Sequence, residues 1–269
     1  MRRLELHWTE YLIEACCLAL FMLSAVAFAV LFQHPASPLA SQPVASADPR
    51  TVIERLPMAL AMGLTAAAII YSSPGRRSGA HMNPAVTLAF FRLRRITAID
   101  AFGYVAAQFA GGIGGVSLAV AWLRPLPAHP AVNYVATIPG PAGIGAAFVA
   151  EAAISALLML MVLTMSSSTL LARWTGAAAA VLVTAFIAIE APLSGMSMNP
   201  ARTLASAAFA GTGDLWIYLV APPLGMLASA ELFVRLGVAR HVRCAKLHHG
   251  GVNTGARCIF HCGHPEATT

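Results

Sequence analysis

A seven-residue motif occurs twice in the chain and places side-chain amides where they could bind small oxygen-bearing molecules. Residues 82–88 read Met-Asn-Pro-Ala-Val-Thr-Leu and residues 198–204 read Met-Asn-Pro-Ala-Arg-Thr-Leu, with six identities in seven positions. An asparagine directly before a proline is typical of a helix N-cap followed by the first helical residue. The motifs predict two helix starts, at Asn83-Pro84-Ala85 and at Asn199-Pro200-Ala201.

The chemistry of these helix starts depends on where the two amides point. Asn83 and Asn199 could simply cap their helices, which is a structural role. They could also face a shared passage, where their N–H groups would hold the oxygen of water or an alcohol. Two helix N-termini meeting there would direct their positive dipole ends at the passage and repel cations. A water held by two donors has both lone pairs occupied, which would interrupt a chain of proton transfers.

The sequence that must position these motifs is unusually apolar. Of 269 residues, 58% are hydrophobic and 10% are charged, and the mean hydropathy is +0.71. Soluble domains carry about 25% charged residues, so a soluble enzyme and a disordered chain are excluded. The net charge of +6 could indicate nucleic acid or a membrane surface, and the apolar composition favours the lipid bilayer over nucleic acid. No nucleophile–base pair or phosphate-binding loop stands in the apolar region, so we do not expect an enzyme.

Six charge-poor stretches approach the ~20 residues that a membrane-spanning helix needs. They are residues 15–32, 56–73, 101–123, 152–172, 174–189 and 215–230. The motif helices, predicted over 84–92 and 200–210, are too short to cross. The sequence therefore predicts an all-α membrane protein with six transmembrane helices and two re-entrant half-helices.

The chain divides into two halves of opposite orientation. The motifs are 116 residues apart, and each follows the second span of its half. Three spans separate the halves, so the second motif enters from the other side of the membrane, as in inverted repeats that surround a central pore. We predict an N-terminal segment at 1–10, repeats at 11–125 and 144–239, a connecting loop at 126–143 and a tail at 240–269.

The distribution of cations predicts the orientation in the membrane. Thirteen of the 17 Lys and Arg residues fall on the face shared by the two termini: Arg2, Arg3, Arg76, Arg77, Arg92, Arg94, Arg95, Arg173, Arg235, Arg240, Arg243, Lys246 and Arg257. By the positive-inside rule both termini are cytoplasmic, which suits a protein of the cytoplasmic (inner) membrane.

A few polar residues near membrane depth need an explanation, because charges there are costly and usually functional or paired. Arg202 could snorkel to the interface or face the passage. Glu14 and Glu151 stand near the start of the first span in each half, either as interfacial carboxylates or as supports for the re-entrant loops. His81 precedes the first motif and could line a vestibule or be buried and hydrogen-bonded.

Two Asn-Pro-Ala motifs, the second continuing into Arg202, in a duplicated six-span chain resemble the aquaporin (major intrinsic protein) family over residues 8–238. The sequence Ser194-Gly-Met-Ser-Met-Asn-Pro-Ala-Arg is similar to members that conduct glycerol and uncharged metalloid acids. The resemblance implies a passive channel for small neutral solutes and water, a homotetramer, and no required cofactor. It also implies that Glu14 and Glu151 accept hydrogen bonds from the re-entrant loops.

The resemblance further implies a narrow selectivity filter that includes Ile187, Met196 and Arg202. The second-span position falls on Met62 if Met62-Gly-Leu-Thr is aligned, and on Gly63 by counting back from Asn83; we favour Met62. Water-selective members carry Phe and His at the second-span and fifth-span positions, and neither is present here. An apolar filter with one donor cluster predicts passage of glycerol-sized solutes, with a water-selective pore as the alternative.

After residue 239 the composition changes to a tail rich in Cys and His. Cys244-x3-His248 and Cys258-x3-Cys262 are close to zinc-ligand spacings, and disulfides are not expected in a reducing cytoplasm. The tail could be a basic segment with chance cysteines, or a small zinc site formed by Cys244, His248, Cys258 and Cys262. Two other functional classes remain open: an alternating-access transporter, and a non-conducting protein that uses the tail for metal sensing or adhesion.

Overall fold

The computed structural model describes residues 6–40, 52–248 and 258–260. Within those residues all regular structure is helical. Six segments are long and apolar enough to cross a membrane: α1 (Trp8–Gln33), α2 (Val52–Tyr71), α5 (Ala98–Leu123), α6 (Gly143–Ser166), residues Ala172–Ile189 ending in α7 (Thr175–Ile189), and α10 (Leu215–Arg235). The predicted six-span, all-α fold is confirmed.

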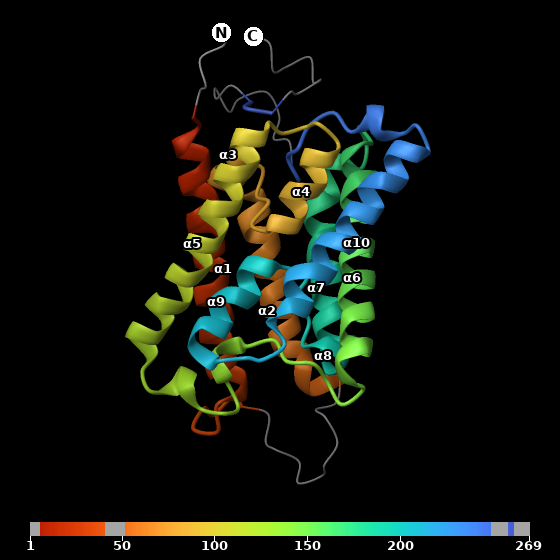
Figure 1. The fold of residues 1–269 in the computed structure, drawn as a ribbon. Coiled ribbons are helices and arrows are strands. Elements are labelled where there is room, and N and C mark those ends of the chain that lie inside the picture. Colours follow the sequence, from red (N-terminus) through yellow and green to blue (C-terminus); the bar gives the residue numbers. More distant parts are fainter. Residues whose placement is uncertain (1–5, 41–51, 249–257, 261–269) are drawn as a thin grey trace.

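Most of the shorter helices lie in the connections between these spans; the turn at Ala172–Trp174 begins the fifth span, and the turn at Ala239–His241 follows the last one. The shorter helices are α3 (Ser73–Ser78), α4 (Pro84–Arg92), α8 (Ala191–Ser194), α9 (Pro200–Ala210), and single 3-10 turns at Leu126–Ala128, Asn133–Val135, Ala172–Trp174 and Ala239–His241. Both α4 and α9 begin at the motif proline, where the fixed φ of proline suits a first helical residue. They enter the bundle from opposite ends (Figure 1).

The packing of the helices repeats between the two halves. In the first half α1 packs along α5, and in the second half α6 packs along α10. The half-helices exchange partners, since α4 packs on α10 and α9 packs on α5, while α2 and α7 pack on each other. This reciprocal arrangement is that of an inverted repeat.

Glycines allow α5 to pack closely on α1. A Cβ atom built on Gly111 would lie 2.1 Å from the carbonyl oxygen of Ala15, and one on Gly115 would lie 2.3 Å from that of Ala19. Any larger residue would force α5 away from α1, as expected for a small-xxx-small crossing. The glycines of α5 therefore hold α1 in the position that carries Glu14 into the bundle.

Candidate functional site

The two motif helices meet with their N-termini facing each other. The Asn83 side-chain oxygen accepts a hydrogen bond from the Ala85 N–H at 2.8 Å, and that of Asn199 accepts from the Ala201 N–H at 3.1 Å. Both asparagines are thus N-caps, and both also line a cavity inside the bundle. The sequence left open whether these asparagines cap their helices or face a shared passage. In the structure each one caps its helix and also borders the cavity.

Each asparagine also bridges to the opposite half. Asn83 Nδ2 donates to the Met198 carbonyl oxygen at 2.7 Å, and Asn199 Nδ2 donates to the Met82 carbonyl oxygen at 2.7 Å. A primary amide carries two hydrogens, so one is engaged in this bridge and the second remains for a molecule in the cavity. The sequence did not predict the bridges, because they join residues 115 and 117 positions apart.

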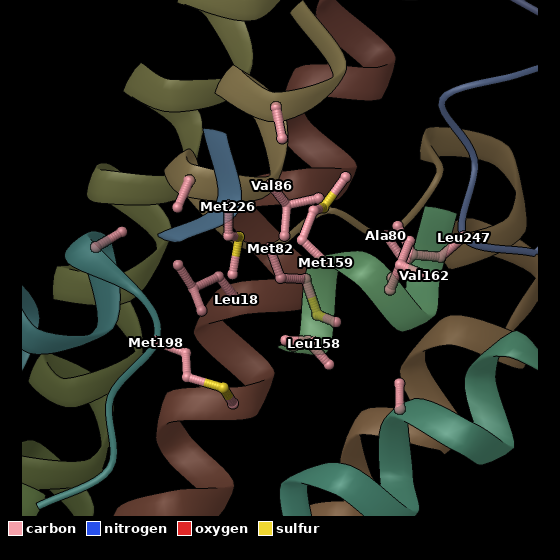
Figure 2. Close-up of a cluster of buried hydrophobic side chains, with 14 of the residues drawn as sticks. Leu18, Ala80, Met82, Val86, Leu158, Met159, Val162, Met198, Met226 and Leu247 are labelled. Atoms are coloured by element: carbon pink, nitrogen blue, oxygen red, sulfur yellow. The ribbon is translucent and has the colours of Figure 1, made fainter. Parts of the chain in front are cut away.

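The cavity has a volume of about 310 Å³ and is bordered by both halves of the chain. Its lining includes Glu54 near the start of α2 and Ile70 near its end, so it follows most of the length of that helix. Five thioether side chains line it: Met58, Met62, Met82, Met196 and Met198. Figure 2 shows Met82 and Met198 among the apolar side chains at the centre of the bundle.

All four residues of the expected filter, Met62, Ile187, Met196 and Arg202, border this one cavity. The structure also distinguishes the two possible second-span residues. Gly63 faces α7, where an added Cβ would lie 2.1 Å from Thr184 Oγ1 and 2.7 Å from the Ala180 carbonyl oxygen. Met62 is therefore the residue that reaches the cavity.

Arg202 lies in the first turn of α9. Its backbone N–H donates to Asn199 Oδ1 at 3.3 Å. Its guanidinium nitrogen Nη1 is buried and has no hydrogen-bond partner among the described residues. A buried donor without a partner is costly in a folded protein, and the residue that carries it borders the cavity.

Glu14 holds the loop that leads to the first motif. One carboxylate oxygen accepts from Ser78 Oγ at 2.7 Å and from the His81 N–H at 3.1 Å. The other accepts from the Met82 N–H at 2.7 Å and from Gln108 Nε2 at 2.9 Å. Because Glu14 is fully buried, these four donors compensate the desolvation of its charge.

Glu151 holds the second loop in the same way. It accepts from Ser194 Oγ at 2.7 Å, from the Ser197 N–H at 2.6 Å and from the Met198 N–H at 2.7 Å. Both loops need this support because their backbones are strained. Met82 and Met198 have φ values of 48° and 54°, in the left-handed region that non-glycine residues rarely adopt. The two glutamates fix a conformation in which the loop carbonyls accept the asparagine bridges.

Further paired residues complete the two loops and were missed in the sequence. Tyr104 donates its hydroxyl to the Ser78 carbonyl oxygen at 2.6 Å, and Tyr218 donates to the Ser194 carbonyl oxygen at 2.5 Å. A signal was present, since each copy has Ser-Gly beginning five residues before the motif asparagine.

His81 both borders the cavity and is fully hydrogen-bonded. Its ring nitrogens lie 3.0 Å from Thr87 Oγ1 and 2.6 Å from the Ala245 carbonyl oxygen. Only 3% of the residue is exposed. The sequence left two interpretations of His81 open, lining a vestibule or being buried and hydrogen-bonded. In the structure it borders the cavity and is also buried and hydrogen-bonded.

The structure brings together two of the four expected tail ligands. Cys244 Sγ and Cys258 Sγ lie 3.6 Å apart. The His248 ring packs edge-on against Tyr71, with centroids 4.9 Å apart, and Cys262 lies outside the described residues. Within the described ranges no three His, Cys, Asp or Glu side chains form a metal-binding group.

Comparisons with known proteins agree with this geometry. Residues 2–233 match the sequence profile of the family described as "Major intrinsic protein". The chain is 35% identical over 210 residues to "Aquaporin NIP3-1" of Oryza sativa subsp. japonica, covering 77% of this chain and 64% of the relative. It is 34% identical over 184 residues to "Glycerol uptake facilitator protein-like 6" of Lactiplantibacillus plantarum, covering 65% of this chain and 82% of the relative.

The fold is also similar to a solved structure. The aquaglyceroporin from Plasmodium falciparum superposes with a TM-score of 0.70 and 17% sequence identity, covering 87% of this chain and 98% of that one. At this identity the likeness concerns the fold alone. The chain spans just under two thirds of the length of the rice relative.

Proposed function

The chain belongs to the major intrinsic protein family, and we propose that it forms a passive membrane channel for small uncharged solutes. The solutes are glycerol or molecules of similar size, uncharged metalloid acids such as boric acid, and water. The observation that carries this proposal is a single cavity bordered by both capping asparagines and by an arginine with an unpartnered donor.

The proposed roles of the site residues follow from their contacts. Asn83 and Asn199 each use one amide hydrogen in the bridge between the halves. The second amide hydrogen of each donates to the oxygen of a solute. Arg202 offers a further donor, and its charge together with the two facing helix N-termini repels cations. Glu14 and Glu151 are scaffold residues that hold the loops without touching the solute.

The filter composition supports passage of solutes larger than water. The carbon chain of glycerol would meet the apolar side chains of Met62, Ile187 and Met196, and its hydroxyl groups would accept hydrogen bonds from Arg202. Flexible thioether side chains adapt to different shapes. The alternative is a water-selective pore, in which the same side chains crowd the passage against larger molecules.

An alternating-access transporter is the less favoured mechanism. Coupling to protons would need a titratable carboxylate open to the passage at membrane depth. Glu54 borders the cavity, but it lies in the first turn of α2, at the end of that span. Both oxygens of Glu14 accept two hydrogen bonds each, and Glu151 accepts three hydrogen bonds from its own loop. Glu190 is buried but is not among the residues that border the cavity.

Several further features belong to the proposal. We expect both termini to be cytoplasmic, with the protein in the inner membrane, and a homotetramer as the assembly. Figure 1 supports a shared side, because α1 begins and α10 ends at the same end of the bundle. We also propose zinc in the tail, supported by the close approach of Cys244 and Cys258.

The proposal is tested by measuring flux into vesicles that contain the purified chain. Shrinking and reswelling under osmotic gradients of glycerol, urea and boric acid are compared with water flux and with protein-free vesicles. We expect uptake of glycerol or boric acid well above the protein-free rate, without saturation and without dependence on a proton gradient. Fast water flux with no uptake of any of the three solutes would establish the water-selective alternative instead.

A further inference from the structure

Two segments that follow the last spanning helix, residues 242–248 and 258–260, lie against one end of the cavity. We call them together the C-terminal mouth segment. Leu247 borders the cavity along with Ala80 and Val162, and Figure 2 shows these three side chains near one another. Val242, Ala245 and Leu247 are all buried. Part of the cavity wall is thus formed by residues outside the six-span bundle.

The mouth segment pairs with the loop that carries the first motif. The Leu247 N–H donates to the Gly79 carbonyl oxygen at 3.1 Å. The Ala245 carbonyl oxygen lies 2.6 Å from Nε2 of His81. The segment is therefore attached to the two residues on either side of Ala80, three residues before Asn83.

Aromatic contacts hold the second piece of the segment against the bundle, and a cysteine pair joins it to the first piece. The Phe260 ring stacks on His81 with centroids 5.7 Å apart and packs edge-on against Tyr104 at 6.0 Å. Cys244 and Cys258 bring the first piece within 3.6 Å of the second. The segment is consequently a small folded unit with an apolar tip, Leu247, at the cavity.

The other half of the chain shows why this docking is unusual. The loop between the repeats covers the second motif loop, where the Gly140 N–H donates to the Leu193 carbonyl oxygen at 2.9 Å. Ile138 and Thr137 lie against Gly195 just as Ala245 and Lys246 lie against Gly79. The inter-repeat loop must connect two helices and cannot leave. The mouth segment does not lie between any of the six described spans, and the contacts that dock it are non-covalent, so it can detach without breaking the bundle.

We propose that the C-terminal mouth segment is an autoinhibitory plug, which restricts passage when docked and raises solute flux when released. This proposal rests on the channel function proposed above. The docked state is held by two polar contacts to the loop, by the Phe260 and His248 rings, and by the burial of Val242, Ala245 and Leu247. A partner that binds the released segment better than the docked one would shift the population toward the open channel.

The first test releases the plug in the full-length chain. Leu247→Glu places a carboxylate in a buried apolar site, which is costly and favours the undocked segment. Arg243→Glu is the matched control, because it introduces the same side chain four residues away at an exposed position of the same segment. Glycerol and water flux are measured in vesicles for both variants and the parent chain. We expect severalfold faster flux for Leu247→Glu and no such increase for Arg243→Glu.

The second test fixes the plug in place. Ala80→Cys and Leu247→Cys are combined in a chain whose own five cysteines are replaced by alanine. The cysteine-free chain without the two new thiols is the reference, because it also lacks the contact between Cys244 and Cys258. Oxidation should link the two new thiols, which mass spectrometry detects, and flux should fall severalfold and recover on reduction. Failure of the link to form would mean that the segment does not dock beside Ala80, and would overturn the proposal.

The outcomes separate this proposal from the function on which it rests. Solute or water flux that is measurable but equal in the parent, released and linked chains would overturn the plug and leave the channel intact. Flux at the protein-free level for every solute and for water, in all three forms, would overturn the channel and the plug with it.

Discussion

The side-chain nitrogen of Asn83 lies 2.7 Å from the carbonyl oxygen of Met198, in the opposite half of the chain. Asn199 makes the reciprocal bond to Met82. Each asparagine thereby performs three tasks, since its oxygen caps a helix, one amide hydrogen joins the halves, and the other is free for the cavity. Asparagine suits all three tasks, because a carboxylate lacks the donors and a hydroxyl has a single hydrogen.

The Asn83 bridge can be separated from the Asn83 cap by two substitutions. Asn83→Ser keeps an N-cap oxygen and loses the bridge, which should cost about 1 kcal/mol of stability. Asn83→Ala loses the cap as well, at a further cost of about 1 kcal/mol. Thermal unfolding in detergent should therefore give Tm values in the order parent, serine, alanine. Equal Tm values for the serine variant and the parent would show that the bridge contributes nothing.

The support that Glu14 gives to the first motif loop can be tested by replacing its carboxylate with a neutral amide. In Glu14→Gln one carboxylate oxygen becomes an NH2 group that faces a backbone N–H, either that of His81 or that of Met82, so at least one buried hydrogen bond is lost together with the charge. We expect a loss of about 3 kcal/mol and a large fall in solute flux, because the first loop no longer holds Asn83 in place. Glu151→Gln should lower stability and solute flux in the same way, because Glu151 holds the second loop.

Glu231→Gln is the control for these changes. Glu231 pairs with Arg92 and Arg235 at the surface, so its loss should leave flux and Tm almost unchanged. A Glu14→Gln variant that matched this control in both measurements would contradict the scaffold role.

The assignment of Met62 over Gly63 gives a further prediction. Met62→Trp should reduce glycerol flux by roughly tenfold and water flux less, because a larger side chain fills a passage that Met62 borders. Gly63→Ala should instead lower Tm, because its Cβ would collide with Thr184 and Ala180 of α7. The comparison uses vesicle flux and thermal unfolding for both variants. A reversed pattern, with selectivity changed by Gly63→Ala alone, would place the filter on Gly63.

The proposed zinc site is tested by metal analysis of the purified full-length chain. We expect about one zinc per chain, lost in Cys258→Ser, since Cys244 and Cys258 would supply two thiolates of a tetrahedral site. Cys16→Ser is the control, because Cys16 lies in α1. Absence of bound zinc, or zinc retained in Cys258→Ser, would remove the proposal.

The membrane fold could be predicted from the sequence because its signals are local. Long apolar stretches mark the spans, and the prolines at 84 and 200 mark the starts of α4 and α9. The duplicated motif also revealed that the halves are inverted, since the number of spans between copies fixes the side from which each enters. The capping role of Asn83 follows from the same local pattern.

The contacts that join the halves could not be predicted in this way. The bridge from Asn83 to Met198 and the pairing of His81 with Ala245 depend on how distant segments pack, and no periodicity reports this. The choice between Met62 and Gly63 likewise required the rotation of α2 against α7. The pairs of serine and tyrosine are of the same kind. Ser78-Gly79 and Ser194-Gly195 repeat in the sequence, but Tyr104 and Tyr218 lie 26 and 24 residues from the serines that they contact, so no local pattern joins them.

The last prediction concerns Arg202, whose side-chain nitrogen Nη1 is buried without a partner in the described part of the chain. Arg202→Val removes a unit positive charge from a partly dry passage, which should lower the barrier to a cation by at least ~1.4 kcal/mol and raise its leak about tenfold. Proton leak is measured with a pH-sensitive dye inside vesicles under a potassium diffusion potential. Arg173→Val is the control, since Arg173 is exposed, outside the cavity, and lies over the Trp174 ring. If the two variants leak equally, the arginine does not exclude cations, and the facing helix dipoles of α4 and α9 must do so without it.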